Sequence, residues 1–309
     1  MLKEKEHQMD KAKFEKFIMD SCKSQEWNLR GFLKRVLKKN GFQLIEDNYR
    51  SRRGDKFAEV HNLLAIKGSP KVCLVAHTDV CRDHAGEEMR PVPVIKEQNG
   101  KRYIQDRDCM VQVGGDDRLG VAINTYYALN THNDIALLFT TDEETGAISA
   151  DYLTIPEVMD FELLLQVDRG NHSNQLVNFI GGVKLCNEAT TRRLINISNE
   201  IGYPRTVVNG MLTDVMAIKG NGMCKNAVNI TCGYHSSYGA GSNEYISVDE
   251  AIETFKYVEA IVDYYAANKH LDEPEIIENI VEEEDDEDDL LLRDLFSDEE
   301  YAKYRNWDA

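Results

Sequence analysis

Apolar residues recur along the chain at two different spacings, and the spacing predicts which segments are helices and which are strands. In 29–37 they recur every three to four residues, which predicts a helix, and Gly41 follows as a stop signal. Short continuous apolar runs at 71–76, 135–140 and 163–167 are typical of strands that are buried on both faces. The same criteria predict strands at 57–66 and 227–232 and helices around 14–18 and at 119–129.

The last long helix of the body has a clear start signal. Ser247 and Glu250 form a capping box, and the residues after it place apolar side chains on one helix face as far as Tyr265. Strands and helices therefore alternate along the chain, which predicts an α/β fold with a largely parallel sheet covered by helices. We expect residues 1–271 to form one catalytic domain.

The end of the chain has a different composition. Pro274 marks a boundary, and 282–289 is a run of eight acidic residues, which repel one another and are typical of disorder. The apolar LLLRDLF at 290–296 follows, and then a second capping box that predicts a short terminal helix. Residues 272–309 are thus either a solubilising tail or a segment that docks on a protein partner.

The net charge of −18 is concentrated in this tail, because 272–309 carries −14 and 1–271 only −4. An acidic chain argues against binding to nucleic acid, which needs a Lys/Arg surface. No apolar run reaches the roughly 20 residues of a membrane span, and the first residues resemble no secretory signal. Seven cysteines without a C-x-x-C pair indicate reduced thiols, so we expect a cytoplasmic protein without a membrane partner.

Polar side chains collect where the predicted strands end, and open α/β sheets bind ligands at that edge. The residues concerned are His77, Asp79, Asp116, Asp117, Glu143, Glu144, Asp168 and His235. So many carboxylates would repel one another unless a cation lay among them. Histidine and carboxylate are zinc ligands, and their number exceeds what one tetrahedral ion takes. It suits two ions that share a bridging carboxylate.

The order of these residues is more specific than any one of them. The segments VAHTDV, GGDDRLG, TDEETGA, QVDRG and YHSSYG, in this order, resemble the co-catalytic zinc exopeptidase clan, which includes peptidase T and the TET aminopeptidases. The resemblance covers about 14–261 and implies a three-layer, mixed but largely parallel sheet flanked by helices. Only 67 residues separate Asp168 from His235, so the lid or dimerisation domain of some relatives has no room here.

The resemblance also implies a role for each residue. His77 and Asp168 would bind one ion, Glu144 and His235 the other, and Asp116 would bridge the two. Glu143 would be the general base, and Asp79 would orient His77 through its other ring nitrogen. The peptide bond after Asp116 is cis in the family. The implied cofactors are two Zn²⁺ ions per chain, with Co²⁺ or Mn²⁺ as alternatives.

The resemblance favours an aminopeptidase or exopeptidase that cleaves small peptides with metal-activated water and Glu143 as base. An N-acyl amino-acid deacylase of the same clan is an alternative. A second alternative is a non-catalytic scaffold that retains metal and binds a partner through its acidic tail. Glu143 argues against the scaffold, because a scaffold has no use for an acid that is not a ligand. Side-chain preference and oligomeric state stay open.

Overall fold

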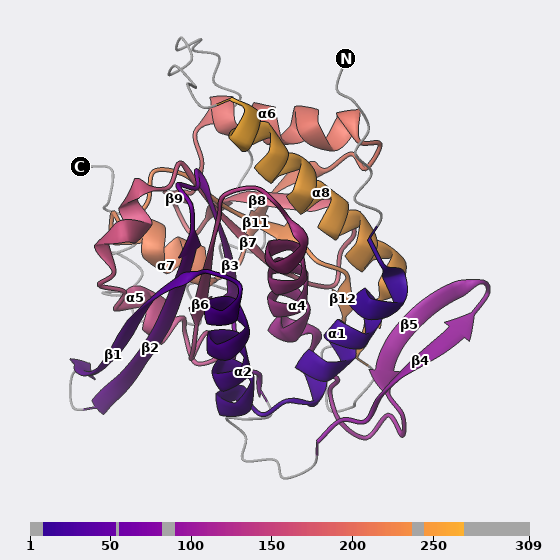
Figure 1. Cartoon of the computed structure of the whole chain (residues 1–309). Helices are drawn as coiled ribbons and strands as arrows, with labels where there is room; N and C mark the ends of the chain where they lie inside the picture. Colours follow the sequence, from indigo (N-terminus) through magenta and orange to yellow (C-terminus); the bar gives the residue numbers. More distant parts are fainter. Residues whose placement is uncertain (1–8, 54–55, 82–89, 237–243, 269–309) are drawn as a thin grey trace.

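The computed structural model describes residues 9–53, 56–81, 90–236 and 244–268 (Figure 1). The predictions for the tail at 272–309 lie outside these residues. Within the described part of the chain, no helix is both long and apolar enough to cross a membrane.

Nine strands form the main sheet, in the order β1-β2-β6-β3-β7-β11-β8-β10, with β9 pairing with β8. They are β1 (Gln43–Arg53), β2 (Lys56–Lys67), β3 (Val72–His77), β6 (Ile135–Thr140), β7 (Leu163–Arg169), β8 (Gln175–Ile180), β9 (Val183–Lys184), β10 (Thr206–Gly210) and β11 (Ala227–Thr231). The central strands β6, β3, β7 and β11 run parallel, whereas β1 and β2 are antiparallel additions. The sheet is therefore mixed and largely parallel at its centre, as predicted.

A second, smaller sheet stands apart from the main one. Its order is β12-β13-β5-β4, and all its pairings are antiparallel. The strands are β4 (Pro93–Gln98), β5 (Lys101–Asp106), β12 (Tyr234–His235) and β13 (Tyr245–Ser247). Figure 1 shows the β4–β5 hairpin projecting from the body of the molecule.

Helices cover both faces of the main sheet, and each face has its own apolar core (Figure 1). The helices are α1 (Lys11–Lys23), α2 (Glu26–Lys39), α4 (Gly115–Asn130), α5 (Ile148–Asp151), the 3-10 turn Pro156–Asp160, α6 (Glu188–Glu200), α7 (Asp214–Gly220) and α8 (Val248–Ala267). The larger core contains residues of α1, α2, α4, α6 and α8, and the smaller contains residues of α5 and α7. This is the expected three-layer arrangement.

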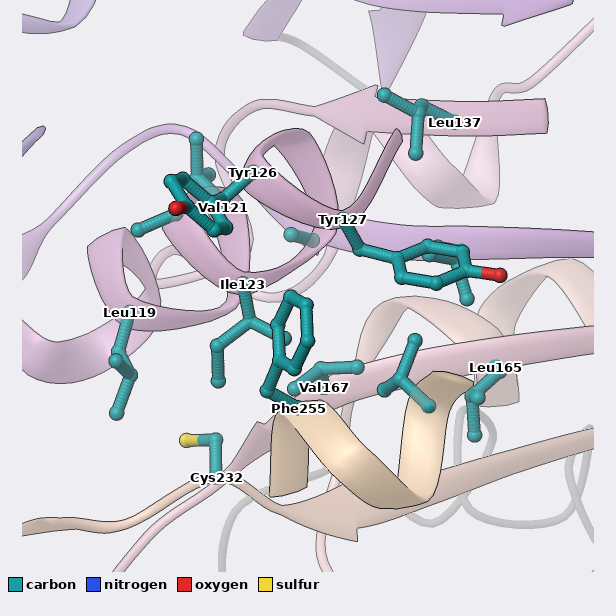
Figure 2. Packing of buried hydrophobic residues seen from close by; sticks show 14 of the residues in the cluster. Leu119, Val121, Ile123, Tyr126, Tyr127, Leu137, Leu165, Val167, Cys232 and Phe255 are labelled. Atoms are coloured by element: carbon teal, nitrogen blue, oxygen red, sulfur yellow. The ribbon is translucent and has the colours of Figure 1, made fainter. Parts of the chain in front are cut away.

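Helix α4 lies in the middle of the larger core. Its apolar side chains leave the helix in several directions and meet both the strands and Phe255 of α8 (Figure 2). Gly120 allows the close approach to β7, because a Cβ there would lie 2.1 Å from the carbonyl oxygen of Val167. The start of α4, which carries Asp116 and Asp117, is therefore held against the ends of the central strands.

The structure confirms the predicted central strands and helices, and Ser247 caps α8 through a 3.4 Å bond from the Glu250 backbone N–H to its hydroxyl. The Glu250 carboxylate does not close the capping box, because it contacts His235 instead. Elements that the sequence pattern did not predict include β1, the β4–β5 hairpin, β8, β10 and α6.

Candidate metal centre

The central parallel strands bring four of the predicted site residues together. Strand β3 ends at His77, and its neighbour β7 carries Asp168 near the same edge. Nε2 of His77 lies 2.9 Å from Oδ1 of Asp116, 3.4 Å from Oδ1 of Asp168 and 3.9 Å from Oε2 of Glu143. One ring nitrogen and three carboxylates therefore converge on a common point.

These spacings suit a metal ion. In a tetrahedral zinc site with bonds of about 2.0–2.2 Å, neighbouring ligand atoms lie roughly 3.3–3.6 Å apart. The 3.4 Å distance from His77 Nε2 to Asp168 lies in that range, whereas the 2.9 Å distance to Asp116 is that of a hydrogen bond. His77, Asp117 and Asp168 also form a buried trio whose ligand atoms lie within 4.8 Å of one another. The residues present thus fit a divalent cation bound through nitrogen and oxygen.

Asp79 has the position that the resemblance implies. Nδ1 of His77 lies 3.2 Å from its carbonyl oxygen and 3.3 Å from Oδ1 of its carboxylate. The same carboxylate accepts the backbone N–H groups of Glu143, at 3.3 Å, and Glu144, at 3.2 Å. Asp79 is fully buried, and its carboxylate links His77 to the backbone of the glutamate pair.

The turn into α4 separates two adjacent aspartates. Their peptide bond is cis, as the resemblance implies. Asp116 faces His77 Nε2, whereas the carboxylate of Asp117 accepts the backbone N–H groups of His77, at 3.3 Å, and Gly120, at 2.9 Å. Asp117 therefore ties the end of β3 to α4. The sequence analysis gave it no role, although its place beside Asp116 was a visible signal.

Tyr234 is a second residue that the sequence analysis missed. Its hydroxyl donates a 2.6 Å hydrogen bond to Oδ2 of Asp116. Two glycines make room for this residue: a Cβ at Gly170 would lie 2.2 Å from the Tyr234 ring, and a Cβ at Gly115 would lie 2.4 Å from the Cβ of Tyr234. The only sequence signal was its position next to His235.

Burial and like charge dominate the electrostatics. Burial raises the pKa of Asp116 to about 8, and the charge of Asp168 adds to the rise. Burial also raises the pKa of Glu143 well above its usual range, although His77 opposes this. For His77, burial lowers the pKa, but hydrogen bonds to Asp116, Asp168 and Asp79 outweigh it and raise the pKa well above the usual range. His77 is thus the one cationic group that these carboxylates share, and a bound metal ion would reduce the repulsion among them.

The other two predicted ligands have different partners. Glu144 accepts the Cys81 backbone N–H at 3.1 Å and the Cys81 thiol at 2.9 Å. Nε2 of His235 lies 2.9 Å from Oε2 of Glu250, and its ring stacks on Tyr245 with centroids 5.0 Å apart. Among the described residues, no hydrogen bond or ion pair joins Glu144 or His235 to the other predicted ligands. The charge of Glu144 nevertheless contributes to the raised pKa of Asp116.

A cavity of about 200 Å³ opens beside the cluster. Asp116, Glu143 and Asp168 form one wall, and Tyr234 and Val177 are among the other lining residues. Two larger hollows, of about 540 and 410 Å³, are lined by other residues, among them His132 and Asn133, and by none of the predicted site residues. The smaller cavity is therefore the one that gives access to the cluster.

Comparison with known proteins identifies the fold. No family model and no curated protein sequence matches this chain. Solved structures do match. Aminopeptidase PepT from Bacillus cereus is 14% identical with a TM-score of 0.65 over 82% of this chain and 98% of its own. A TET aminopeptidase from a Thaumarchaeota archaeon is 12% identical with a TM-score of 0.60 over 81% and 96%. The chain shares the fold of these aminopeptidases.

The same fold also occurs in another kind of enzyme. Glutaminyl cyclase from Tannerella forsythia is 14% identical, with a TM-score of 0.57 over 82% of this chain and 98% of its own. The resemblance to peptidase T and the TET aminopeptidases is thus confirmed at the level of the fold, in a single-domain chain. The roles of the individual site residues stay predictions.

Proposed function

We propose that this protein is a metal-dependent aminopeptidase that acts on small peptides. The observation that carries the proposal is the convergence of Asp116, Asp168 and Glu143 on Nε2 of His77, beside a cavity and on a fold shared with aminopeptidases. His77, Asp116 and Asp168 would hold the first ion, and Glu144 and His235 would join Asp116 at a second. Bound zinc supplies a water of lowered pKa and polarises the scissile carbonyl.

Glu143 is the residue best placed to move protons. Its carboxylate lines the cavity and lies 3.9 Å from His77 Nε2, while its backbone N–H is held by Asp79. Burial raises the pKa of Glu143 well above that of a free glutamate, and a cation bound beside it would oppose that rise. Glu143 would take a proton from the attacking water and deliver it to the leaving amine.

The fold shared with known enzymes supports cleavage at a chain end. The solved structures that match over most of this chain include aminopeptidases, and this favours the amino end of a peptide over the carboxyl end.

Two further predictions belong to this proposal. All seven cysteines lie in the described part of the chain and are free thiols, which supports a cytoplasmic location. The proposed partners are peptide substrates. A protein partner for the acidic tail stays a prediction, since 272–309 lies outside the described residues.

Metal analysis with a substrate panel tests the proposal. The protein would be stripped with a chelator, reloaded with Zn²⁺, Co²⁺ or Mn²⁺, and assayed on leucyl tripeptides, their N-acetylated forms and a glutaminyl peptide. We expect about two ions per chain and hydrolysis only of peptides with a free amine. His77→Ala should lower occupancy of the first ion, and His235→Ala that of the second.

The outcomes separate the alternatives. Cleavage of the N-acetylated substrates would indicate a deacylase, and cyclisation of the glutaminyl peptide would indicate the activity named for the Tannerella forsythia relative. Metal binding without turnover of any substrate would favour a scaffold. A stoichiometry of one ion in metal-replete protein would exclude the two-metal centre.

A further inference from the structure

The two oxygens of the Asp168 carboxylate have different surroundings. Oδ1 faces Nε2 of His77 at 3.4 Å. Oδ2 accepts three hydrogen bonds, from the hydroxyl of Thr213 at 3.0 Å and from the side-chain amides of Gln166 and Asn229 at 3.2 Å each. All three donors are neutral and buried, and they come from β7, the start of α7 and β11. We call these three residues the Asp168 clamp.

The clamp residues are themselves fixed. Oε1 of Gln166 accepts the backbone N–H of Val215 at 3.0 Å, so the NH₂ group of this amide points to Asp168. Oδ1 of Asn229 accepts the backbone N–H groups of Asp168 and Arg169, at 3.2 Å each. Each amide thus has a backbone partner that sets which of its atoms faces the carboxylate.

A second buried carboxylate lies behind the clamp. Oδ2 of Asp214 accepts the hydroxyl of Thr140 at 2.7 Å and the amide of Gln166 at 3.4 Å. Its other oxygen, Oδ1, is buried and has no hydrogen-bond partner within the described residues. Gln166 therefore donates to two carboxylates at once and lies between them, which fixes its position on both sides.

We propose that Gln166, Thr213 and Asn229 are positioning residues that hold Asp168 as a one-oxygen metal ligand. Three donors occupy Oδ2, so only Oδ1 is available to an ion beside His77. This inference rests on the proposed metal centre and adds residues that do not touch the ion. Loss of one donor would leave two on Oδ2, so the carboxylate would be freer to rotate or to bind an ion through both oxygens. Loss of such supporting contacts elsewhere lowers metal affinity by about 10–100-fold.

Thr213→Val is the sharpest test, because it removes one hydroxyl and nearly preserves the shape. Thr213 precedes α7 but makes no side-chain capping bond there, so the helix start does not depend on the hydroxyl. Thr254→Val is the matched control in another part of the core: that buried hydroxyl donates to the carbonyl of Thr231 and accepts from Arg205, as the hydroxyl of Thr213 donates to Asp168 and accepts from Asn229. Thr213→Ser restores the donor without the methyl group.

The readouts are Zn²⁺ affinity from competition with a chelating indicator, and the visible absorption of the Co²⁺-loaded protein, which weakens as coordination number rises. For Thr213→Val we expect affinity to fall about 10–100-fold and the Co²⁺ absorption to weaken. Thr254→Val should lose thermal stability but keep the parent affinity and spectrum, and Thr213→Ser should recover both.

If folded Thr213→Val keeps the Zn²⁺ affinity and Co²⁺ spectrum of the parent protein, the proposal that the clamp positions Asp168 is wrong. An equal loss in Thr213→Ser would also overturn it, since packing rather than the hydroxyl would then be responsible. A parent protein that binds no metal overturns both the clamp and the metal centre. If the parent binds metal but cleaves no peptide, the proposed peptidase function fails, while the affinities still decide the clamp.

Discussion

The two halves of the predicted metal centre differ in how the fold places them. His77 and Asp168 lie on adjacent parallel strands of one sheet, and Asp116 joins them from the start of α4. Glu144 and His235 have other partners, Cys81 and Glu250, and His235 belongs to the second sheet.

The difference has a physical cause. Residues on neighbouring strands are placed by main-chain hydrogen bonds, which fix their register before any ligand binds. Glu144 lies in the turn after β6 and His235 on the second sheet, so no strand pairing sets the position of one side chain relative to the other, and each contacts a nearby partner. The first half is therefore preorganised, and an ion would have to compete with Cys81 and Glu250 to complete the second half.

The largest expected effect on activity comes from substituting Glu143, and its neighbour Glu144 should respond differently. Glu143→Gln removes the proposed base but no ligand, so we expect kcat to fall roughly 10²–10⁴-fold, or about 3–5.5 kcal/mol of barrier, with metal content unchanged. Glu144→Gln should lose metal from the second half, and excess metal should partly restore its activity. Metal analysis and kinetics on both variants check this. Metal loss in Glu143→Gln with retention in Glu144→Gln would reverse the two roles.

Metal removal should destabilise the protein, because the buried carboxylates then lack a counter-ion. A ligand at 100 times its Kd stabilises the folded state by about 2.7 kcal/mol. Thermal unfolding with and without chelator should therefore show a lower Tm for the stripped protein. If the first half alone is preorganised, one equivalent of Zn²⁺ should restore most of the loss. Equal steps from the first and second equivalents would contradict the difference between the halves.

Asp79 and Glu250, the carboxylates that contact the two histidines, allow a matched comparison with smaller expected effects. Asp79→Asn places an amide where two backbone N–H groups need acceptors, so metal affinity should fall about 10–100-fold. Glu250→Gln changes a partly exposed contact of His235. Its amide oxygen can still face the ring, so only a few-fold loss is expected, confined to the second ion. Titration of both variants with Co²⁺ measures the loss of metal affinity in each. A larger loss in Glu250→Gln than in Asp79→Asn would refute the prediction.

Truncation after Leu271 should have the smallest effect. No predicted ligand or base lies beyond His235, so kcat and metal stoichiometry should stay within a few-fold of the full chain. Steady-state kinetics and metal analysis on the truncated protein test this. Loss of the second ion alone would mean that the tail contributes to the second half of the centre.

The sequence predicted those parts of the fold that depend on local pattern. The apolar runs at 71–76, 135–140 and 163–167 are buried on both faces of the sheet, so their composition alone identifies them as strands. Strand β1 was missed because its sequence, QLIEDNYRSRR, is mostly polar, and its pairing with β2 is what makes it a strand. The β4–β5 hairpin lies largely at the surface and has no apolar run.

The same limit applies to the site. The convergence of His77, Asp116, Glu143 and Asp168 could be predicted because strand ends meet at one edge of a sheet. The Asp168 clamp could not, because glutamine, asparagine and threonine are common polar residues without a motif. Only the alternation of Gln166 and Asp168 along β7, which places both on one face, was a signal. The partners of Glu144 and His235 depend on side-chain packing, which no spacing encodes.

Tyr234 restricts which sequences can vary together. Its ring occupies the space that a side chain at 170 would fill, and its Cβ occupies the space that a side chain at 115 would fill. A homologue that keeps a tyrosine at 234 in this position is therefore limited to glycine at both of the others. A homologue with a small residue at 234 is released from that limit at 170 but not at 115, because every residue except glycine keeps the Cβ. Positions 170 and 234, far apart in the chain, should thus evolve together, and their joint variation among homologues would show which of them retain the contact between Tyr234 and Asp116.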